Sequence, residues 1–124
     1  MNQPVSKVCY QFFSVLANPT RLAILELLRD GPRSVTEIAE ALKKEQSMIS
    51  HSLKPLTRCR LVFVEKRKRE HIYHLNRETM EKIFKIFSYH AKKYCSTEGK
   101  CLTERGLEEH KKKEASTPLY LNHL

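Results

Sequence analysis

Apolar residues recur at every third or fourth position in several stretches of the chain, which is the spacing that collects them on one face of a helix. The first stretch covers residues 5–16 and predicts a helix with one buried stripe. A second helix is predicted to start at Asn18, because asparagine caps helices and Pro19 suits the first helical position. Its pattern stops at residues 30–32, Asp-Gly-Pro, which predicts the helix end there.

Two further helices are predicted close together. The segment Ser34-Val35-Thr36-Glu37 has the sequence of a capping box, with serine at the cap and glutamate three residues later, and predicts the start of a third helix. A fourth is expected to begin near Gln46 and to bury aliphatic residues spaced three to four apart. Pro55 inside it lacks a backbone donor, so a kink or an early loosening is expected at that point.

The pattern changes after the fourth helix. Residues 61–64 and 71–75 are rich in β-branched and aromatic residues and predict two strands joined by residues 65–70. Asn76 can cap a fifth helix that reaches about residue 94, and the polar residues 96–124 permit one more short helix around 102–113. The expected fold is mainly α with a small β-hairpin wing. It is a winged helix-turn-helix domain of about five helices over residues 1–95, followed by a polar C-terminal extension over 96–124.

Composition fits one globular domain with an anionic partner. The chain has 124 residues, of which 40% are hydrophobic, and this is enough for a modest core. No apolar run approaches the roughly 18 residues of a membrane span, and the first residues lack the apolar part of a secretion signal, so a cytoplasmic protein without membrane contact is expected. Four scattered cysteines do not make a disulfide framework.

The positive charge is concentrated in one part of the chain. Residues 43–69 hold nine basic and two acidic residues, which is +7 of the total charge of +9. Neutralised phosphates release counterions, so charge gathered on one supersecondary unit is typical of nucleic-acid binding. The early residues of the second helix of a helix-turn-helix face base edges in the major groove. The expected DNA contacts are Gln46, Ser47, Ser50, His51 and Lys54 on the fourth helix and Lys66, Arg67, Lys68 and Arg69 at the hairpin tip.

Two simpler interpretations of these residues stay open. Ser47 is also a suitable helix cap without any role at DNA. The basic hairpin tip is also what a solvated turn looks like. The two patterns taken together favour DNA binding over either alternative.

Several segments together resemble the ArsR/SmtB family of bacterial and archaeal repressors. They are Ala17-Asn18-Pro19-Thr20-Arg21-Leu22, residues 35–42, residues 47–53 and Tyr73-His74-Leu75, within a similarity that covers about residues 8–94. The resemblance implies a homodimer with the first and last helices at its interface. It also implies a transcriptional repressor that leaves its double-stranded DNA operator on a metal, metalloid or thiol signal, with base contacts from the fourth helix and phosphate contacts from the wing.

The chain departs from the effector sites of that family. Where many members have Cys-Val-Cys in the third helix, this chain has Glu37-Ile38-Ala39-Glu40, without a thiol. The zinc positions of other members correspond here to Arg77, Thr79, His90 and Lys93, and one ligand in four does not make a zinc site, so no metal site is expected. Arg60 stands where a glycine usually ends the recognition helix, and a left-handed backbone there would cost about 1 kcal/mol.

Cys95 and Cys101 are the candidate sensor. Five residues separate them, with Gly99 among these, so both sulfurs can meet in a disulfide or on a soft ion. The effector would be a thiol oxidant or arsenite, and arsenite needs a third sulfur from Cys9 or Cys59. Packing accounts for Cys9 and Cys59 as well as sensing does. For Cys95 and Cys101, a role in sensing and the absence of such a role both stay open.

The leading hypothesis is a dimeric DNA-binding repressor that responds to a thiol-directed signal through Cys95 and Cys101. Two alternatives stay open: a thiol-based metal or metalloid carrier that keeps the winged fold, and a winged domain that docks proteins without binding a duplex. An enzyme is not expected, because the chain has no paired carboxylates in an apolar setting, no phosphate-binding loop and no nucleophile spacing. No cofactor is expected either.

Overall fold

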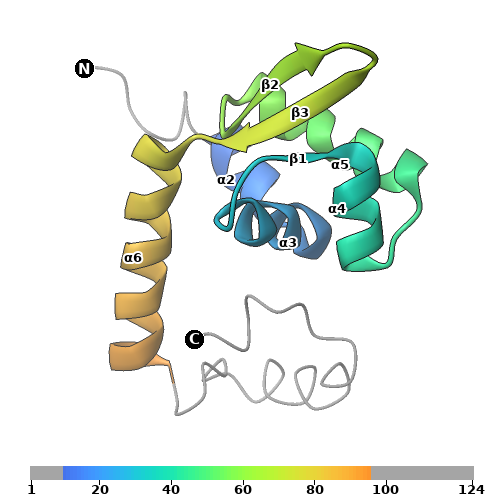
Figure 1. Cartoon of the computed structure of the whole chain (residues 1–124). Coiled ribbons are helices and arrows are strands. Elements are labelled where there is room, and N and C mark those ends of the chain that lie inside the picture. Colours follow the sequence, from blue (N-terminus) through green and yellow to red (C-terminus); the bar gives the residue numbers. More distant parts are fainter. Residues whose placement is uncertain (1–9, 96–124) are drawn as a thin grey trace. The chain divides into compact units, whose positions relative to one another are not determined.

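The computed structural model describes residues 10–95 of the chain. In chain order, this part contains α2 (Tyr10–Leu16), α3 (Pro19–Leu28), β1 (Arg33–Ser34), α4 (Val35–Leu42), α5 (Gln46–Arg58), β2 (Val62–Arg67), β3 (Glu70–Leu75) and α6 (Arg77–Tyr94) (Figure 1). The chain divides into two compact units after Asn76, so α6 belongs to a different unit from the elements before it. No helix within residues 10–95 is long and apolar enough to cross a membrane.

The helix α3 begins where the sequence predicts. The Oδ1 atom of Asn18 accepts a hydrogen bond from the backbone N–H of Arg21 at 3.0 Å, and Pro19 is the first residue of α3. Such a cap is worth about 1 kcal/mol, because it satisfies one donor that the first helical turn leaves free. α2 ends at Leu16 as predicted, while the predicted start of that helix, residues 5–9, lies outside the described residues.

Arg21 ties α2 to α3. Its Nε donates a hydrogen bond to the carbonyl oxygen of Val15 at 2.6 Å, and its Nη2 donates to the carbonyl oxygen of Ser14 at 3.2 Å. The last carbonyls of a helix lack their full set of intrahelical donors, and a cation is favourable at that end of the helix dipole. One side chain therefore satisfies the end of α2 and fixes it to the first turn of α3.

The capping box at the start of α4 forms in both directions. The Oγ of Ser34 accepts from the backbone N–H of Glu37 at 3.2 Å, and the Oε1 of Glu37 accepts from the backbone N–H of Ser34 at 3.0 Å. The backbone N–H of Ser34, and after it the side-chain hydroxyl of Ser34, interact with the Glu37 carboxyl and hold its pKa below the ordinary value of 4.5. The box fixes the residue at which α4 begins.

The core lies where α3, α4 and α5 meet the base of the hairpin. It is made of aliphatic side chains that are 0–1% exposed: Ile24, Leu25 and Leu28 of α3, Ile38 of α4, Ile49, Leu53 and Leu56 of α5, and Leu61 and Val62 at the entry to β2. Full burial of one such side chain contributes about 1.5–3 kcal/mol. Because α5 places three of its residues in this core, the face that it turns to solvent is fixed.

The sheet is larger than the sequence predicts. β2 and β3 pair in antiparallel register from Val62 opposite Leu75 to Arg67 opposite Glu70, so the connection is the two residues 68–69 instead of the predicted 65–70. A third strand, β1, was not predicted and pairs with β3 on its other side, with Arg33 opposite Tyr73 and Ser34 opposite Ile72. Two residues are too short to show the alternation by which a strand is recognised in a sequence.

Pro55 does not end α5, which continues to Arg58. The helix then closes in a Schellman pattern: the N–H of Arg60 donates to the carbonyl of Thr57, and the N–H of Leu61 donates to the carbonyl of Leu56. Arg60 has a φ of 57°, so the left-handed backbone expected at the usual glycine position is present. Lys43, with a φ of 55°, closes α4 by the same pattern.

Two helices, α2 and α6, leave large aromatic side chains exposed. On α6, Met80 and Ala91 are buried, but Phe87 and Tyr94 are 45% and 53% exposed. On α2, Leu16 is buried and Phe13 is 57% exposed. The expectation of one buried stripe on the helix over residues 5–16 is therefore wrong at Phe13. Large exposed aromatic side chains on two helices are a feature of interfaces.

Candidate nucleic-acid interface

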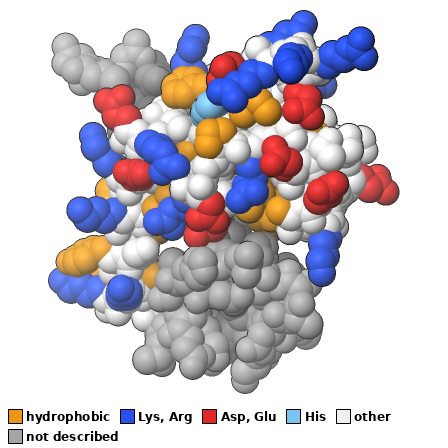
Figure 2. Space-filling view, in the orientation of Figure 1, with side chains coloured by type: hydrophobic (Ala, Val, Ile, Leu, Met, Phe, Trp, Pro, Cys, Tyr) orange, Lys and Arg blue, Asp and Glu red, His pale blue; other side chains and the backbone are white. Residues whose placement is uncertain are grey.

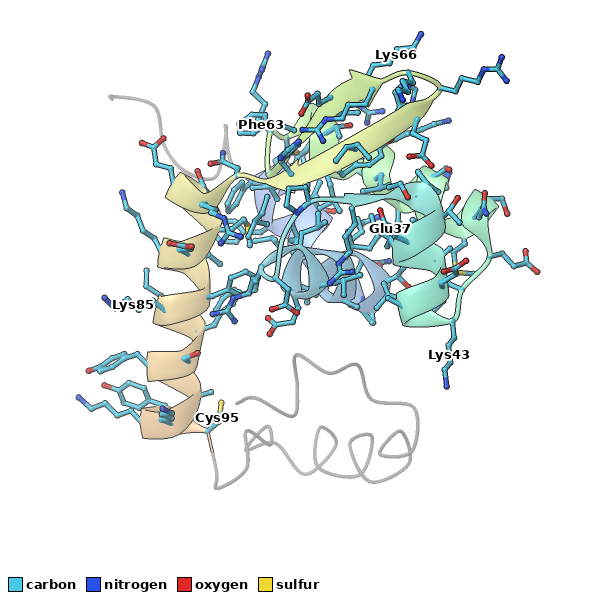
Figure 3. The ribbon with its side chains drawn as sticks, viewed as in Figure 1. Glu37, Lys43, Phe63, Lys66, Lys85 and Cys95 are labelled. Carbon is cyan, nitrogen blue, oxygen red and sulfur yellow. The ribbon has the colours of Figure 1, made fainter. Side chains whose placement is uncertain are left out.

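The α4–α5 pair forms the helix-turn-helix. Three residues, 43–45, join the two helices, and Lys43 points away from the end of α4 (Figure 3). The turn closes because Lys43 adopts the left-handed conformation, and the N–H of Lys44 donates to the carbonyl of Ala39 at 3.0 Å. α5 then starts at Gln46, as predicted.

Every predicted DNA contact on α5 lies on its exposed side. The buried residues of this helix are Ile49, Ser52, Leu53 and Leu56. The five predicted contacts are all exposed: Gln46, Ser47, Ser50, His51 and Lys54. At 3.6 residues per turn, these five positions share the side of the helix that faces away from the core. Because its buried residues fix its orientation, α5 presents small polar and basic side chains to solvent along its first two and a half turns.

The helix cap of α5 bears on the role of Ser47. The residue at the cap position is Glu45, and it makes no side-chain capping hydrogen bond. Ser47 is the second residue inside the helix, so the alternative that it serves as the cap is wrong. Two exposed residues of α5 were missed: Met48, which is 47% exposed, and Arg58 in the last turn. The amphipathic pattern could have found both, since neither position belongs to the apolar stripe.

The hairpin gathers the basic residues of the wing. Lys66, Arg67, Lys68 and Arg69 are all exposed, and they occupy the end of β2 and the two-residue turn. Figure 2 shows basic side chains collected over this hairpin, and Figure 3 shows Lys66 extending from it. Lys68 has a φ of 54°, so the turn itself uses a left-handed residue. The wing therefore presents four cations within four consecutive residues.

Glu65 in β2 is an acid next to these basic residues. The Oε1 of Glu65 accepts a hydrogen bond from the Nε of Arg67 at 3.1 Å, and its Oε2 lies 3.0 Å from the Nε2 of His74. The bonds from Arg67 and then His74 hold the pKa of the Glu65 carboxyl below its ordinary value. Sequence reasoning missed this cluster, because His74 reaches Glu65 only through the register of β2 against β3.

The predicted sensor lies partly outside the described residues. Cys95 is a half-buried free thiol directly after α6, whereas Cys101 falls in the range that is not described, so the pair stays a prediction. Cys59 is also a half-buried free thiol, at the end of α5, and Cys9 lies outside the described residues. Among residues 10–95, no group of three or more His, Cys, Asp or Glu side chains could hold a metal ion.

The positions that correspond to zinc ligands make other contacts. Arg77 donates from Nη1 to Glu81 Oε1 at 3.0 Å, and the Nζ of Lys93 donates to the hydroxyl of Tyr89 at 3.0 Å. The ring centroid of His90 lies 5.2 Å from that of Tyr94. The cations at these positions are engaged along α6 itself.

Comparison with known proteins assigns the family. Residues 18–63, from the cap of α3 into β2, match the model of the bacterial regulatory protein family arsR. The chain belongs to the ArsR family. This is a family of winged helix-turn-helix transcriptional regulators and not of enzymes, as the sequence predicts.

Three similar proteins illustrate the relationship. The HTH-type transcriptional regulator NmtR of Mycobacterium tuberculosis is 40% identical over 76 residues, which are 61% of this chain and 63% of NmtR. The arsenical resistance operon repressor of Staphylococcus xylosus is 36% identical over 69 residues, 56% of this chain and 66% of that repressor. The homodimeric winged helix-turn-helix DNA-binding domain Mb0332 of Mycobacterium bovis, solved in solution, has 26% identity and a TM-score of 0.64 over 76% of this chain and 90% of its own. This ArsR-family chain thus spans just under two thirds of the length of these two curated relatives.

Proposed function

We propose that this protein is a homodimeric repressor that binds a double-stranded DNA operator through α5 and the β2–β3 wing. The observation that carries the proposal is the exposed side of α5, where all five predicted contacts lie opposite the buried core residues. Gln46 can pair bidentately with adenine, and Ser47 and Ser50 can reach bases or phosphates. The basic wing supplies the sequence-independent attraction to the phosphate backbone.

The dimer is supported by apolar surface on two helices. Tyr10 and Phe13 of α2 and Phe87 and Tyr94 of α6 are each 45–62% exposed. Exposed aromatic side chains of this size are costly in an isolated chain and are enriched in interfaces between subunits. The homodimeric domain from Mycobacterium bovis is similar to this chain. A two-fold dimer would place two copies of α5 on half-sites about one helical turn of DNA apart.

The effector part of the proposal is a thiol-directed signal received by Cys95 and Cys101. Cys95 is a free, half-buried thiol, and two lysines of the last turn of α6, Lys92 and Lys93, come just before it in the chain. Oxidation to a disulfide, or binding of arsenite with a third sulfur, would join residue 95 to residue 101 and thereby constrain the chain beyond α6. A relative that acts as an arsenical resistance operon repressor makes arsenite a reasonable ligand to test first.

DNA binding is tested by fluorescence anisotropy on a duplex selected by the protein from a random pool. Lys66→Ala should weaken binding to all sequences and reduce the slope of log K against log salt by about 0.9, the value for one phosphate contact. Gln46→Ala should instead relax the choice of base at one position of the site, with little change in that slope. Lys85→Ala on α6 removes the same charge outside the proposed interface and should leave the slope unchanged.

The same assay separates the alternatives. If the wild-type protein shows no salt-dependent duplex binding, the repressor proposal fails, and a carrier or a protein-docking domain becomes the better explanation. If binding is tight under reductant, is lost on mild oxidation, and persists after oxidation in Cys95→Ser, the thiol signal is supported. Binding that is indifferent to oxidants and to arsenite would remove the sensor part alone.

A further inference from the structure

Met48 places an apolar side chain among the polar residues at the start of α5. It is the third residue of the helix and is 47% exposed. Around it on the exposed side are the predicted base contacts nearest the helix start: Gln46, Ser47, Ser50 and His51. Single exposed apolar side chains are common on protein surfaces. This one has a consequence because it lies in the first turn of the second helix of the helix-turn-helix.

Met48 lies at the edge of the exposed side of α5. Successive residues are about 100° apart around a helix, so Met48 is about 60° from His51 and about 40° from Ser52. His51 is exposed, whereas Ser52 is only 7% exposed. About half of Met48 is therefore covered by the protein, and the rest is open to a molecule that contacts the polar side of α5. Its unbranched thioether chain adapts to an irregular surface through three rotatable bonds.

We propose that Met48 is a specificity-determining residue of the DNA interface that packs against the 5-methyl group of a thymine in the major groove. This inference rests on the proposed function. The early residues of the second helix face base edges, and the thymine methyl is the one apolar substituent on those edges. A thioether has no hydrogen-bond donor and is only a weak acceptor. Of the groups on the base edges, the methyl is therefore the one that Met48 can bind well.

This contact adds information that the neighbouring side chains do not supply. The hydroxyls of Ser47 and Ser50 both donate and accept, so they pair with several bases. An apolar side chain accepts the methyl of thymine but offers no partner to the amino group of cytosine, which loses its water at the same place. Met48 thus favours thymine over cytosine. It also fixes on which strand the thymine lies, since an A·T pair carries its methyl on one side only.

The test uses duplexes that differ by one methyl group. Deoxyuridine has the pairing groups of thymidine and lacks only the 5-methyl group, so each thymine of the selected duplex is replaced by uracil in turn. Binding is followed by fluorescence anisotropy. At one position of a half-site, the replacement should weaken wild-type binding by about fourfold, the value for burying one methyl group. The ratio of the two affinities should be the same at low and high salt, because an apolar contact releases no counterion.

Three variants assign the methyl contact to Met48. Met48→Ala should reduce the thymine-to-uracil ratio at that position to about one, because the apolar chain that covers the methyl is gone. Met48→Gln keeps the length of the side chain but adds an amide that loses its water against a methyl, so it should also abolish the ratio. Met48→Leu keeps an apolar chain of similar volume and should retain most of the ratio.

Val64→Ala is the matched control. Val64 is an apolar residue of β2 that is 51% exposed, and it lies outside α5. Its replacement also removes exposed apolar surface, but it should leave the thymine-to-uracil ratio as in wild type. Matching circular-dichroism spectra and unfolding midpoints would show that every comparison concerns folded protein.

Two results would overturn the role of Met48. In the first, wild-type protein binds every uracil-substituted duplex as tightly as the parent duplex. In the second, the ratio persists in Met48→Ala, so that the methyl acts through DNA shape or another residue. Both differ from failure of the proposed function, in which the wild-type protein shows no salt-dependent duplex binding at all.

Discussion

Replacing Arg60 by glycine should stabilise the protein although it deletes a whole charged side chain. Arg60 has a φ of 57° and occupies the left-handed position of the Schellman pattern that ends α5. A left-handed backbone costs a residue with a Cβ atom about 1–2 kcal/mol, and glycine avoids that cost. Glycine also gives the unfolded chain more freedom, which offsets roughly 0.4–1 kcal/mol of the gain. The expected net effect is a stabilisation of about 0.5–1 kcal/mol.

Urea unfolding at fixed protein concentration measures this difference, since a dimer's stability depends on concentration. Arg60→Ala is the matched variant, because it removes the side chain but keeps the Cβ atom, and it should remain less stable than Arg60→Gly. Arg58→Gly deletes the same side chain two residues earlier, inside α5, where glycine should destabilise by about 1 kcal/mol. If Arg60→Gly is no more stable than Arg60→Ala, backbone strain at residue 60 is not what limits stability there.

Two further predictions concern the capping box of α4. Ser34→Ala should lower the free energy of unfolding by about 1 kcal/mol, since it leaves the backbone N–H of Glu37 without its acceptor; chemical denaturation measures this, and an unchanged midpoint would contradict it. The folded-state pKa of Glu37 is lowered, so its ionised form stabilises the fold above about pH 4.5, and this contribution is lost as pH falls through the folded pKa. The stability difference between wild type and Glu37→Gln should therefore shrink between pH 6 and pH 3, and a difference that stays constant over this range would refute the assignment.

Local signals predicted much of this fold. The Asn18 cap, the Ser34–Glu37 box and the start of α5 at Gln46 were all readable, because each depends on residues within one helical turn. The winged helix-turn-helix architecture followed from the order of the predicted helices and strands along the chain. The exposed face of α5 was also predictable, since its apolar stripe fixes which residues face the core.

Contacts between residues that are distant in sequence could not be predicted from such local signals. The pairing of β1 with β3 and the contact of His74 with Glu65 both arise from strand register, which short strands encode weakly. The burial of Phe13 was predicted from periodicity, yet periodicity does not tell a side chain buried in its own chain from one that an interface would cover. The predicted roles of the wing residues and of Cys95 with Cys101 still await the experiments above.

Ser34 belongs to two parts of the molecule at once. It is paired with Ile72 in the sheet, and the next residue begins α4. The wing and the helix-turn-helix are thereby joined by backbone hydrogen bonds next to a capped helix start, so the wing tip and the exposed face of α5 are held at a set separation. For the proposed repressor, this fixed separation would make binding depend on the width of the DNA groove. A duplex whose groove width does not bring a phosphate to the wing while bases meet α5 would be disfavoured, and sequences could then be selected at positions that no side chain touches.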